Sequence, residues 1–293
     1  EPTVSFWDCG EYIATSAKLE VCHPPGAPFF QMIGAFIAAF APNTDKIALL
    51  VNYMSVLSSA FTVFFLYFII VNLAKKIALR SADTLSVAHT IAVMGSGVVG
   101  ALAYTFSDSF WFNAVEAEVY AMAMLFMSVM FWLGIKWTDS LHEPRGDRWL
   151  LLISLVVGLS FGVHFMALLT IPAIGMLYFF NSHYKKNVWN FLLANVVSIA
   201  VLLLIFKLIL PYTLAYFGYL EVYFVNSFGM PFNSGTIIAG LTLVAFFFFA
   251  LRYASQKKKV RLQTATLCLL FVFIGFSSWL MIPIRSNADT VIN

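Results

Sequence analysis

Charged residues are scarce in this chain of 293 residues, where Asp, Glu, Lys and Arg together make up 11%. Hydrophobic residues account for 61%, whereas a soluble domain usually holds about 45–50% apolar and about 25% charged residues. This composition excludes an ordinary soluble enzyme. It predicts an all-α, polytopic membrane protein, because helices satisfy their own backbone polar groups in lipid.

Cysteine is also scarce, and three cysteines cannot build the disulfide framework of a small secreted domain. Cys9 and Cys22 flank an acidic stretch and could pair in an oxidising compartment, although two free thiols are the simpler expectation. The sequence has no Walker A loop, no H-E-x-x-H and no cysteine pair at zinc spacing. A G-x-G-x-x-G match at 95–100 lies inside an apolar run with no strand before it, which excludes a dinucleotide site. Small residues in the same run predict a helix-packing face: Ala92, Ser96 and Gly100.

Long apolar runs dominate what is present. A membrane helix needs about 20 residues, with a range of about 17–25, and the runs predict about eight such helices. They are 47–72, 86–105, 117–135, 149–163, 165–180, 188–210, 236–251 and 262–282. Residues 28–41 are too short to cross and are expected to form an interfacial helix in the first outer segment. We expect a single transmembrane domain over 1–293.

The basic residues predict the orientation. Most Lys and Arg follow the first, third, fifth and seventh apolar runs. All four segments lie on one side, cytoplasmic by the positive-inside rule, if 149–180 is a hairpin of two short helices that turns near His164. The outer side then carries most of the acids, in 1–46, 106–116, 211–235 and 283–293. Chemistry is expected on this outer side.

The first outer segment concentrates the residues best suited to chemistry. Asp8 and Glu11, three positions apart, share one face if the segment is helical. A carboxylate at the rim of a low-dielectric site can serve as a general base, with the second acid orienting it; two solvated loop acids are the plainer alternative. The rigid His-Pro-Pro-Gly turn at 23–26 can aim His23 back at the acids, and it also suits the start of a helix.

Other candidates lie farther along the outer side. Asp108, Glu116 and Glu118 could form a second wall of the site, although acids are also favoured at a helix N-terminus. His164 at the predicted hairpin tip is either a core histidine or a ligand of phosphate or sugar. Arg285 follows the last run and could grip a lipid phosphate with its guanidinium, or it could be an ordinary interfacial anchor.

Five strings carry a family resemblance: PTVSFWDCGE at 2–11, HPPGAP at 23–28, YTFSDSFWF at 104–112, EAEVY at 116–120 and GLSFGVH at 158–164. With them the chain resembles, over about 2–289, a family of bacterial multi-pass proteins of the transmembrane protein 260 type. The animal relative of that family is a protein O-mannosyltransferase. Family members begin with another helix and usually continue past the position of Asn293, so both regions are expected to be missing from this chain.

The resemblance implies an inverting glycosyltransferase of the GT-C class, with a polyprenyl-phosphate sugar donor and a carboxylate base in the first outer loop. Asp8 would take the proton from a Ser or Thr hydroxyl of an exported protein, and Glu11 would orient Asp8 or bind the sugar, mannose being the best choice. The remaining candidates would bind substrate: His23, Asp108, Glu116, Glu118, Tyr120, His164 and Arg285. The location implied is a bacterial inner membrane, with the site on its periplasmic side.

No cofactor is expected. Asp8, Glu11 and Glu116 are hard oxygen ligands that could hold a divalent metal, but cationic side chains can stabilise a leaving phosphate as well. Two other functions compete with transfer. A carrier or flippase for a lipid-linked sugar should show paired broken helices in matching halves, and the sequence has no internal repeat. A non-catalytic membrane subunit would tolerate the loss of Asp8.

Overall fold

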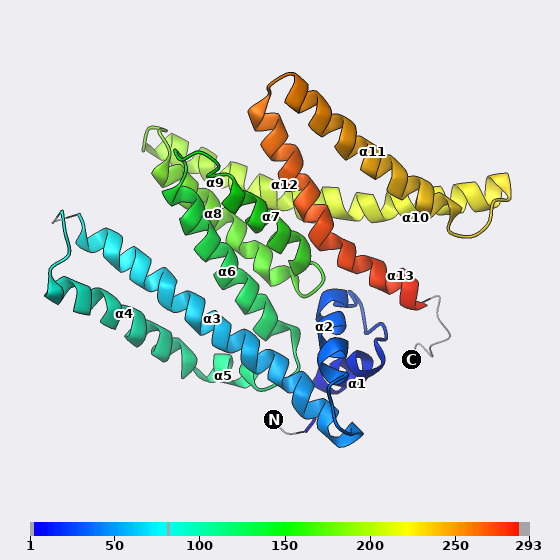
Figure 1. Ribbon diagram of the computed structural model, residues 1–293, viewed down its shortest axis with the longest axis horizontal. Helices are drawn as coiled ribbons and strands as arrows, with labels where there is room; N and C mark the ends of the chain where they lie inside the picture. Colours follow the sequence, from blue (N-terminus) through cyan, green and yellow to red (C-terminus); the bar gives the residue numbers. More distant parts are fainter. Residues whose placement is uncertain (1–2, 81–82, 287–293) are drawn as a thin grey trace. The chain divides into compact units, whose positions relative to one another are not determined.

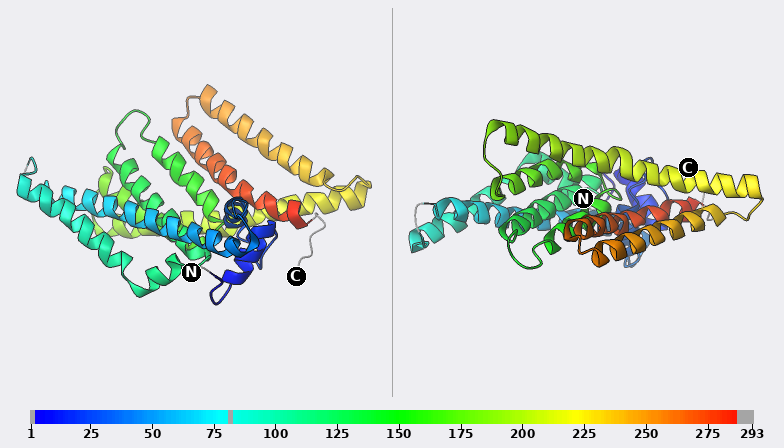
Figure 2. Two further views of the ribbon diagram at one scale, coloured as in Figure 1. Left: turned by 60° about the horizontal axis from the view of Figure 1, so that its bottom comes forward. Right: turned by 90° about the horizontal axis from the view of Figure 1, so that it is seen from above.

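The computed structural model describes residues 3–80 and 83–286. Every regular element within these ranges is helical, which confirms the all-α prediction (Figures 1 and 2). The chain divides into two compact units. The first comprises Glu1–Thr170 and Val272–Asn293, and the second comprises Ile171–Phe271.

The first unit contains the predicted first outer segment and the helices that support it. Its elements are α1 (Cys9–Lys18), α2 (Pro28–Ala38), η1 (Thr44–Lys46), α3 (Ile47–Ala78), α4 (Val87–Thr105), α5 (Asp108–Ala114), α6 (Val119–Asp139), α7 (Arg148–Ser160), η2 (Phe165–Leu169), the end of α12 (Val260–Phe276), η4 (Ser277–Leu280) and α13 (Met281–Ser286). The interfacial helix expected at 28–41 corresponds to α2.

Helix α3 is the central support of this unit, because it packs against both α4 and α6 (Figure 1). Gly97 permits the close approach of α4, since a Cβ there would lie 2.5 Å from a side-chain carbon of Val71. The buried residues of α4 are Val93, Gly97 and Ala101. The predicted packing face is therefore wrong by one position: Ala92 and Ser96 are exposed, although Gly100 approaches Ile70 of α3.

Helices α1 and α2 pack together through buried polar contacts. Ser16 donates a hydrogen bond of 2.7 Å to the side-chain carbonyl of Gln31, whose amide donates one of 2.8 Å to Thr15. Gly34 allows the contact, because a Cβ there would lie 2.3 Å from the Ser16 hydroxyl oxygen. A buried polar group left unpaired costs about 1–3 kcal/mol, so this network fixes how the two helices meet.

Helix α2 begins at Pro28, as expected for a proline in the first turn of a helix. The backbone N–H groups of Phe29 and Phe30 donate to the carbonyl of Gly162, at 2.8 and 3.0 Å. These bonds satisfy two donors that every helix start leaves unpaired. They also tie α2 to the turn between α7 and η2. Cys9 and Cys22 are buried as free thiols, so the alternative of a disulfide is wrong.

The second unit is built from α8 (Thr170–Asn181), α9 (Val188–Leu203), η3 (Leu204–Ile209), α10 (Leu210–Phe228), α11 (Ser234–Gln256) and the start of α12. Helix α10 packs against α11, and a short loop joins them (Figure 1). The Tyr216 hydroxyl lies 2.8 Å from that of Thr242. The Glu221 carboxylate accepts hydrogen bonds from the backbone N–H groups of Asn233 and Thr236, at 2.6 and 2.8 Å.

The outer loop predicted at 211–235 is wrong. Helix α9 continues through the π-helical η3 into α10, so that 188–228 form one helical stretch of 41 residues. Proline normally stops a helix because its ring clashes with a carbonyl in the preceding turn. Here the wider π-helical turn ends two residues before Pro211, and a π-helical turn is one of the known ways in which a helix departs from the regular ladder.

Six helical stretches of the described residues are long and apolar enough to cross a membrane, which confirms a polytopic membrane protein and corrects the predicted number of about eight. The two short runs of 149–180 account for the difference. They form α7 and the stretch Phe165–Asn181, separated by a turn next to His164 as predicted, and both are shorter than the six. Residues 287–293 of the last predicted outer loop lie outside the described residues.

Candidate functional site

Asp8 and Glu11 lie on one face at the start of α1, as their spacing predicts. Asp8 is the N-cap residue, and Glu11 belongs to the first turn. The Asp8 side chain makes no capping hydrogen bond. It faces His23 instead, whose Nε2 atom lies 3.9 Å from Asp8 Oδ2.

Glu11 fixes His23 through two contacts. The imidazole Nδ1 lies 2.8 Å from Glu11 Oε2, and the His23 backbone N–H donates to Oε1 at 2.6 Å. The hydrogen bond to Glu11 raises the pKa of the His23 imidazole above its ordinary value, although partial burial opposes it. One ligand atom each of Asp8, Glu11 and His23 lie within 4.8 Å of one another. The turn at 23–26 therefore brings the ring back to both acids.

A second pair of acids is buried behind the first. Glu116 and Glu118 are 4% and 6% exposed and precede α6 directly. The Ser5 hydroxyl donates to Glu116 Oε1 at 2.6 Å. Glu118 approaches the backbone amide of Asp8, but within the described residues its Oε1 atom has no hydrogen-bond partner. Burial, reinforced by the charges of Asp8 and Glu116, raises the pKa of the Glu118 carboxyl to about 7.

Tyr12 connects the two pairs and was not foreseen. Its ring centroid lies 5.7 Å from that of His23 and 5.2 Å from that of Phe30. Burial, followed by the negative charges around it, raises the pKa of the Tyr12 hydroxyl well above its ordinary value. The available signal was its position four residues after Asp8, which places both side chains on one face of a helix. Ser5 was also missed, and no pattern in the sequence announces its contact with Glu116.

The other candidates divide into a pair of rings in contact and an exposed acid. Tyr120 packs its ring against His164, with 5.2 Å between centroids. His164 Nδ1 accepts a hydrogen bond from the Met166 backbone N–H at 3.1 Å, and burial lowers the pKa of its imidazole. Asp108 is exposed at the first residue of α5. In the described part of the chain, no hydrogen bond or ion pair joins these three residues to Asp8 or Glu11.

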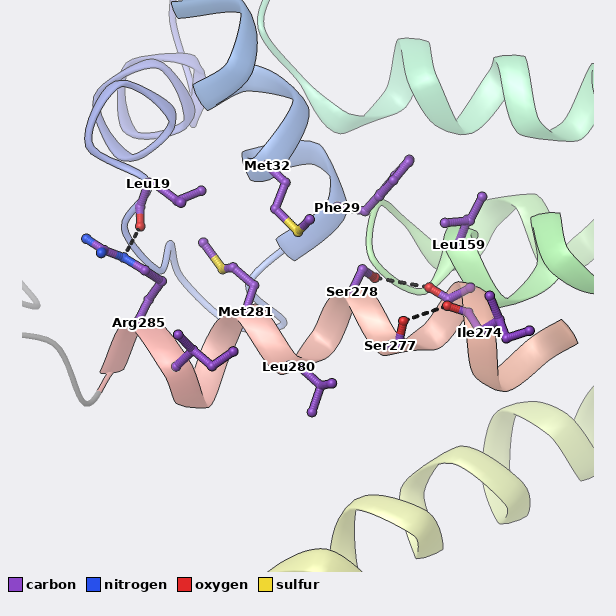
Figure 3. Close-up of a pocket in the computed structure, with 12 residues that line it drawn as sticks. Leu19, Phe29, Met32, Leu159, Ile274, Ser277, Ser278, Leu280, Met281 and Arg285 are labelled. Atoms are coloured by element: carbon purple, nitrogen blue, oxygen red, sulfur yellow. Dashed lines mark hydrogen bonds between the residues drawn. The ribbon is translucent and has the colours of Figure 1, made fainter. Parts of the chain in front are cut away.

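Arg285 closes one end of a cavity in the first unit (Figure 3). Its Nε donates to the carbonyl of Leu19 at 2.6 Å, and its Nη2 donates to that of Lys18 at 3.3 Å. The cavity has a volume of about 460 Å³. Its wall is mainly apolar, and Met32 of α2 and Met281 of α13 lie on it. The cavity therefore offers an apolar wall with a cation at its end.

Comparisons with known proteins identify the family. Residues 8–188, more than half of the chain, match the family described as Protein O-mannosyl-transferase TMEM260 N-terminal domain. The chain is 26% identical over 210 residues to a Dictyostelium discoideum protein named Protein O-mannosyl-transferase tmem260, covering 67% of this chain and 23% of that protein. It is 25% identical over 133 residues to Mus musculus Protein O-mannosyl-transferase TMEM260, covering 45% of this chain and 16% of that protein.

The chain thus spans less than a quarter of the length of these curated relatives. No solved structure matches it. The matched segment 8–188 begins at Asp8 and includes Glu11, His23, Glu116 and Glu118. The residues that converge at the start of α1 therefore lie within the shared region, and the chain belongs to the TMEM260 N-terminal domain family.

Proposed function

We propose that this chain is the membrane core of a GT-C glycosyltransferase that moves mannose from a polyprenyl-phosphate donor to a Ser or Thr hydroxyl of an exported protein. The observation that carries the proposal is the convergence of Asp8, Glu11 and His23 at the partly exposed start of α1. The names of the family and of its relatives support a protein O-mannosyltransferase. The apolar helices support a donor held in lipid.

Asp8 is the proposed base. In an inverting transfer the acceptor hydroxyl oxygen attacks the anomeric carbon, the bond from that carbon to the phosphate oxygen breaks, and its electron pair leaves with the phosphate. The hydroxyl proton passes to the Asp8 carboxylate. Glu11 supports this step because it holds His23 beside Asp8, at 2.8 Å from its own carboxylate. General bases of this kind contribute about 10²–10⁴-fold to rate.

The cavity of Figure 3 is the proposed place for the lipid. Its apolar wall suits the first isoprene units of the donor, and the guanidinium of Arg285 suits the phosphate. Asp8 and Arg285 lie at opposite ends of α1, whose 10 residues span about 15 Å. In an inverting transfer the attacking oxygen and the leaving phosphate lie on opposite sides of the anomeric carbon, so Asp8 would act at one end of this line and Arg285 at the other. A fixed cation at the phosphate supplies the electrostatic stabilisation that enzymes rely on most.

Four further residues stay proposed substrate ligands: His164, Tyr120, Asp108 and Glu116. Among the described residues, no contact indicates which part of the substrate each would bind. The proposed location is a bacterial inner membrane, with the start of α1 on the periplasmic side.

The experiment is sugar transfer from a synthetic polyprenyl-phosphate mannose to a Ser/Thr peptide, with the full-length protein in detergent or nanodiscs. Asp8→Asn is compared with the parent, and Asp45→Asn, an exposed acid of η1 in the same outer segment, is the matched control.

Loss of about 10²-fold or more in transfer by Asp8→Asn, with donor binding and the control unchanged, supports Asp8 as the base. Equal transfer by Asp8→Asn removes Asp8 from the mechanism and leaves Glu11 and Glu116 to be tested. Donor binding without transfer by any variant contradicts the transferase proposal and favours a carrier for lipid-linked sugar.

A further inference from the structure

We propose that Asp8, Glu11 and His23 form a binding site for one divalent cation of the Mn²⁺ and Mg²⁺ class. The two carboxylates and the imidazole come from the first turn of α1 and from the turn that precedes α2. The sequence favoured no metal, because cationic side chains can stabilise a leaving phosphate and the metal ligands it offered were acids alone. In the structure the imidazole of His23 joins Asp8 and Glu11.

The geometry supplies three ligands of suitable chemistry. One atom from each residue can be chosen so that all three lie within 4.8 Å of one another. Carboxylate oxygens suit Mg²⁺ and Mn²⁺, and a single imidazole is common among first-row metals. All three side chains are partly exposed, at 56%, 38% and 41% for Asp8, Glu11 and His23. A bound cation would therefore keep open positions for oxygens of a substrate.

Glu118 provides an independent indication of a missing positive charge. It is 6% exposed, and its Oε1 atom has no hydrogen-bond partner among the described residues. The same carboxyl approaches the backbone amide of Asp8, and its charge acts on His23 and Tyr12. Buried acids without a partner are costly unless a cation is near, so Glu118 lies where the field of a cation at Asp8 would stabilise it.

The surrounding charges do not balance. Asp8 and Glu11 form their ion pairs with His23, and Glu116 and Glu118 add two more carboxyl groups behind them. Across residues 3–80 and 83–286, no Lys or Arg forms an ion pair with any of these four acids. One imidazole cannot neutralise four carboxyl groups, and a divalent cation would supply two of the three positive charges that are still needed.

Cation binding itself does not depend on the reaction, but its role rests on the proposed function. A divalent ion at this place would act as a Lewis acid on an oxygen of the acceptor or the donor. The side chains of Glu11 and His23 would both turn toward the ion, so their bonds to the ion would replace the present contact between them. Asp8 would then bind the ion with one oxygen and accept the proton with the other.

The test measures Mn²⁺ binding to the full-length protein by titration with electron paramagnetic resonance, in the absence of substrate. We expect one Mn²⁺ per chain, displaced by excess Mg²⁺. Asp8→Asn, Glu11→Gln and His23→Gln should each weaken binding by about tenfold or more, because even changes beside metal ligands commonly cost 10–100-fold. Asp45→Asn should bind as the parent does. Unchanged thermal unfolding of each variant without metal shows that the loss is not a folding defect.

Two results would overturn the cation site: a folded parent protein that binds no Mn²⁺, or equal binding by Asp8→Asn and Glu11→Gln. Transfer assays with and without a chelator separate this proposal from the function. Transfer that persists in chelator, with no Mn²⁺ bound, refutes the cation site alone. Mn²⁺ binding that follows the variants as expected, without transfer from any polyprenyl-phosphate mannose, refutes the proposed function alone.

Discussion

Glu118→Gln is expected to raise the free energy of unfolding at neutral and alkaline pH but not at acidic pH. The folded pKa of Glu118 is raised from an ordinary 4.5 to about 7, so between these values the folded chain holds a proton that the unfolded chain has released. Stability therefore falls as pH rises through this window. At 1.36 kcal/mol per pKa unit, the wild-type chain loses about 3 kcal/mol by pH 7, and this loss persists above pH 7.

Glutamine has the size of glutamate but does not ionise, so Glu118→Gln should escape the loss. We expect the variant to match the wild type near pH 4.5 and to exceed its free energy of unfolding by up to about 3 kcal/mol at pH 8. Thermal unfolding in detergent with a chelator, followed by intrinsic tryptophan fluorescence at each pH, measures this difference.

Glu116→Gln is the matched control, since Glu116 is equally buried but accepts a hydrogen bond from Ser5. It should destabilise the protein, because a hydrogen bond to a charged group contributes about 1.5–3 kcal/mol. A stability difference between wild type and Glu118→Gln that is the same at pH 4.5 and pH 8 would show that Glu118 does not titrate as its surroundings require.

Two further changes test the packing and the cavity. Gly34→Ala should lower the free energy of unfolding by about 1–3 kcal/mol, because its Cβ would lie 2.3 Å from the Ser16 hydroxyl oxygen. A Cβ at Gly95 meets nothing within 4 Å, so Gly95→Ala should be neutral or stabilising by up to about 1 kcal/mol. Equal effects of the two changes on thermal unfolding would contradict the close contact at Gly34. Arg285→Lys should weaken binding of polyprenyl phosphate about tenfold, since an ammonium cannot replace the two-pronged hydrogen bonding of a guanidinium. Met281→Trp should fill the cavity and reduce the binding of long-chain donors but not of short-chain donors. Donor binding that neither change affects would place the lipid elsewhere.

Local patterns predicted the part of the site that is local in sequence. The spacing of Asp8 and Glu11 needed only a helix to bring them onto one face, and the stiff turn after Cys22 could be read from its prolines. The position of His23 beside both acids thus depends on interactions between residues at most about 15 positions apart in the chain. Hydrophobic run length likewise predicted most membrane helices, because crossing a bilayer sets a minimum length whatever the helix packs against.

Contacts between distant segments were not predictable in the same way. Acids before a helix are usually solvated residues favoured by the helix dipole, and nothing in the sequence distinguishes Glu118 from such an acid. Its burial arises because α6 packs on α3 and carries residues 116–118 to the amide of Asp8. The packing face of α4 failed for a related reason. The stripe of small residues at 92, 96 and 100 lies next to one that holds Val93, Gly97 and Ala101, and only the partner helix decides between them.

The long helical stretch of the second unit changes how the positive-inside rule applies. Its 41 residues extend about 60 Å, twice the hydrocarbon thickness of about 30 Å. Helix α11 packs back along α10 after a short loop, and its 23 residues return about 35 Å. Arg252 and the basic run at 257–261 therefore lie about 25–30 Å along the axis from Lys185 and Lys186.

This separation equals one bilayer, so an upright α9 would place the two basic clusters at opposite surfaces. The positive-inside rule puts both clusters on the cytoplasmic side, and that holds only if α9 lies along the membrane plane. Lys207 favours a boundary near the middle of the stretch, because it is the one charged residue of 188–220 and charges are costly at the bilayer centre. The stretch either crosses the bilayer as α9 and leaves the hydrocarbon at η3, or it runs along the membrane surface up to η3. In both cases α9 and α10 are not parts of the same membrane crossing.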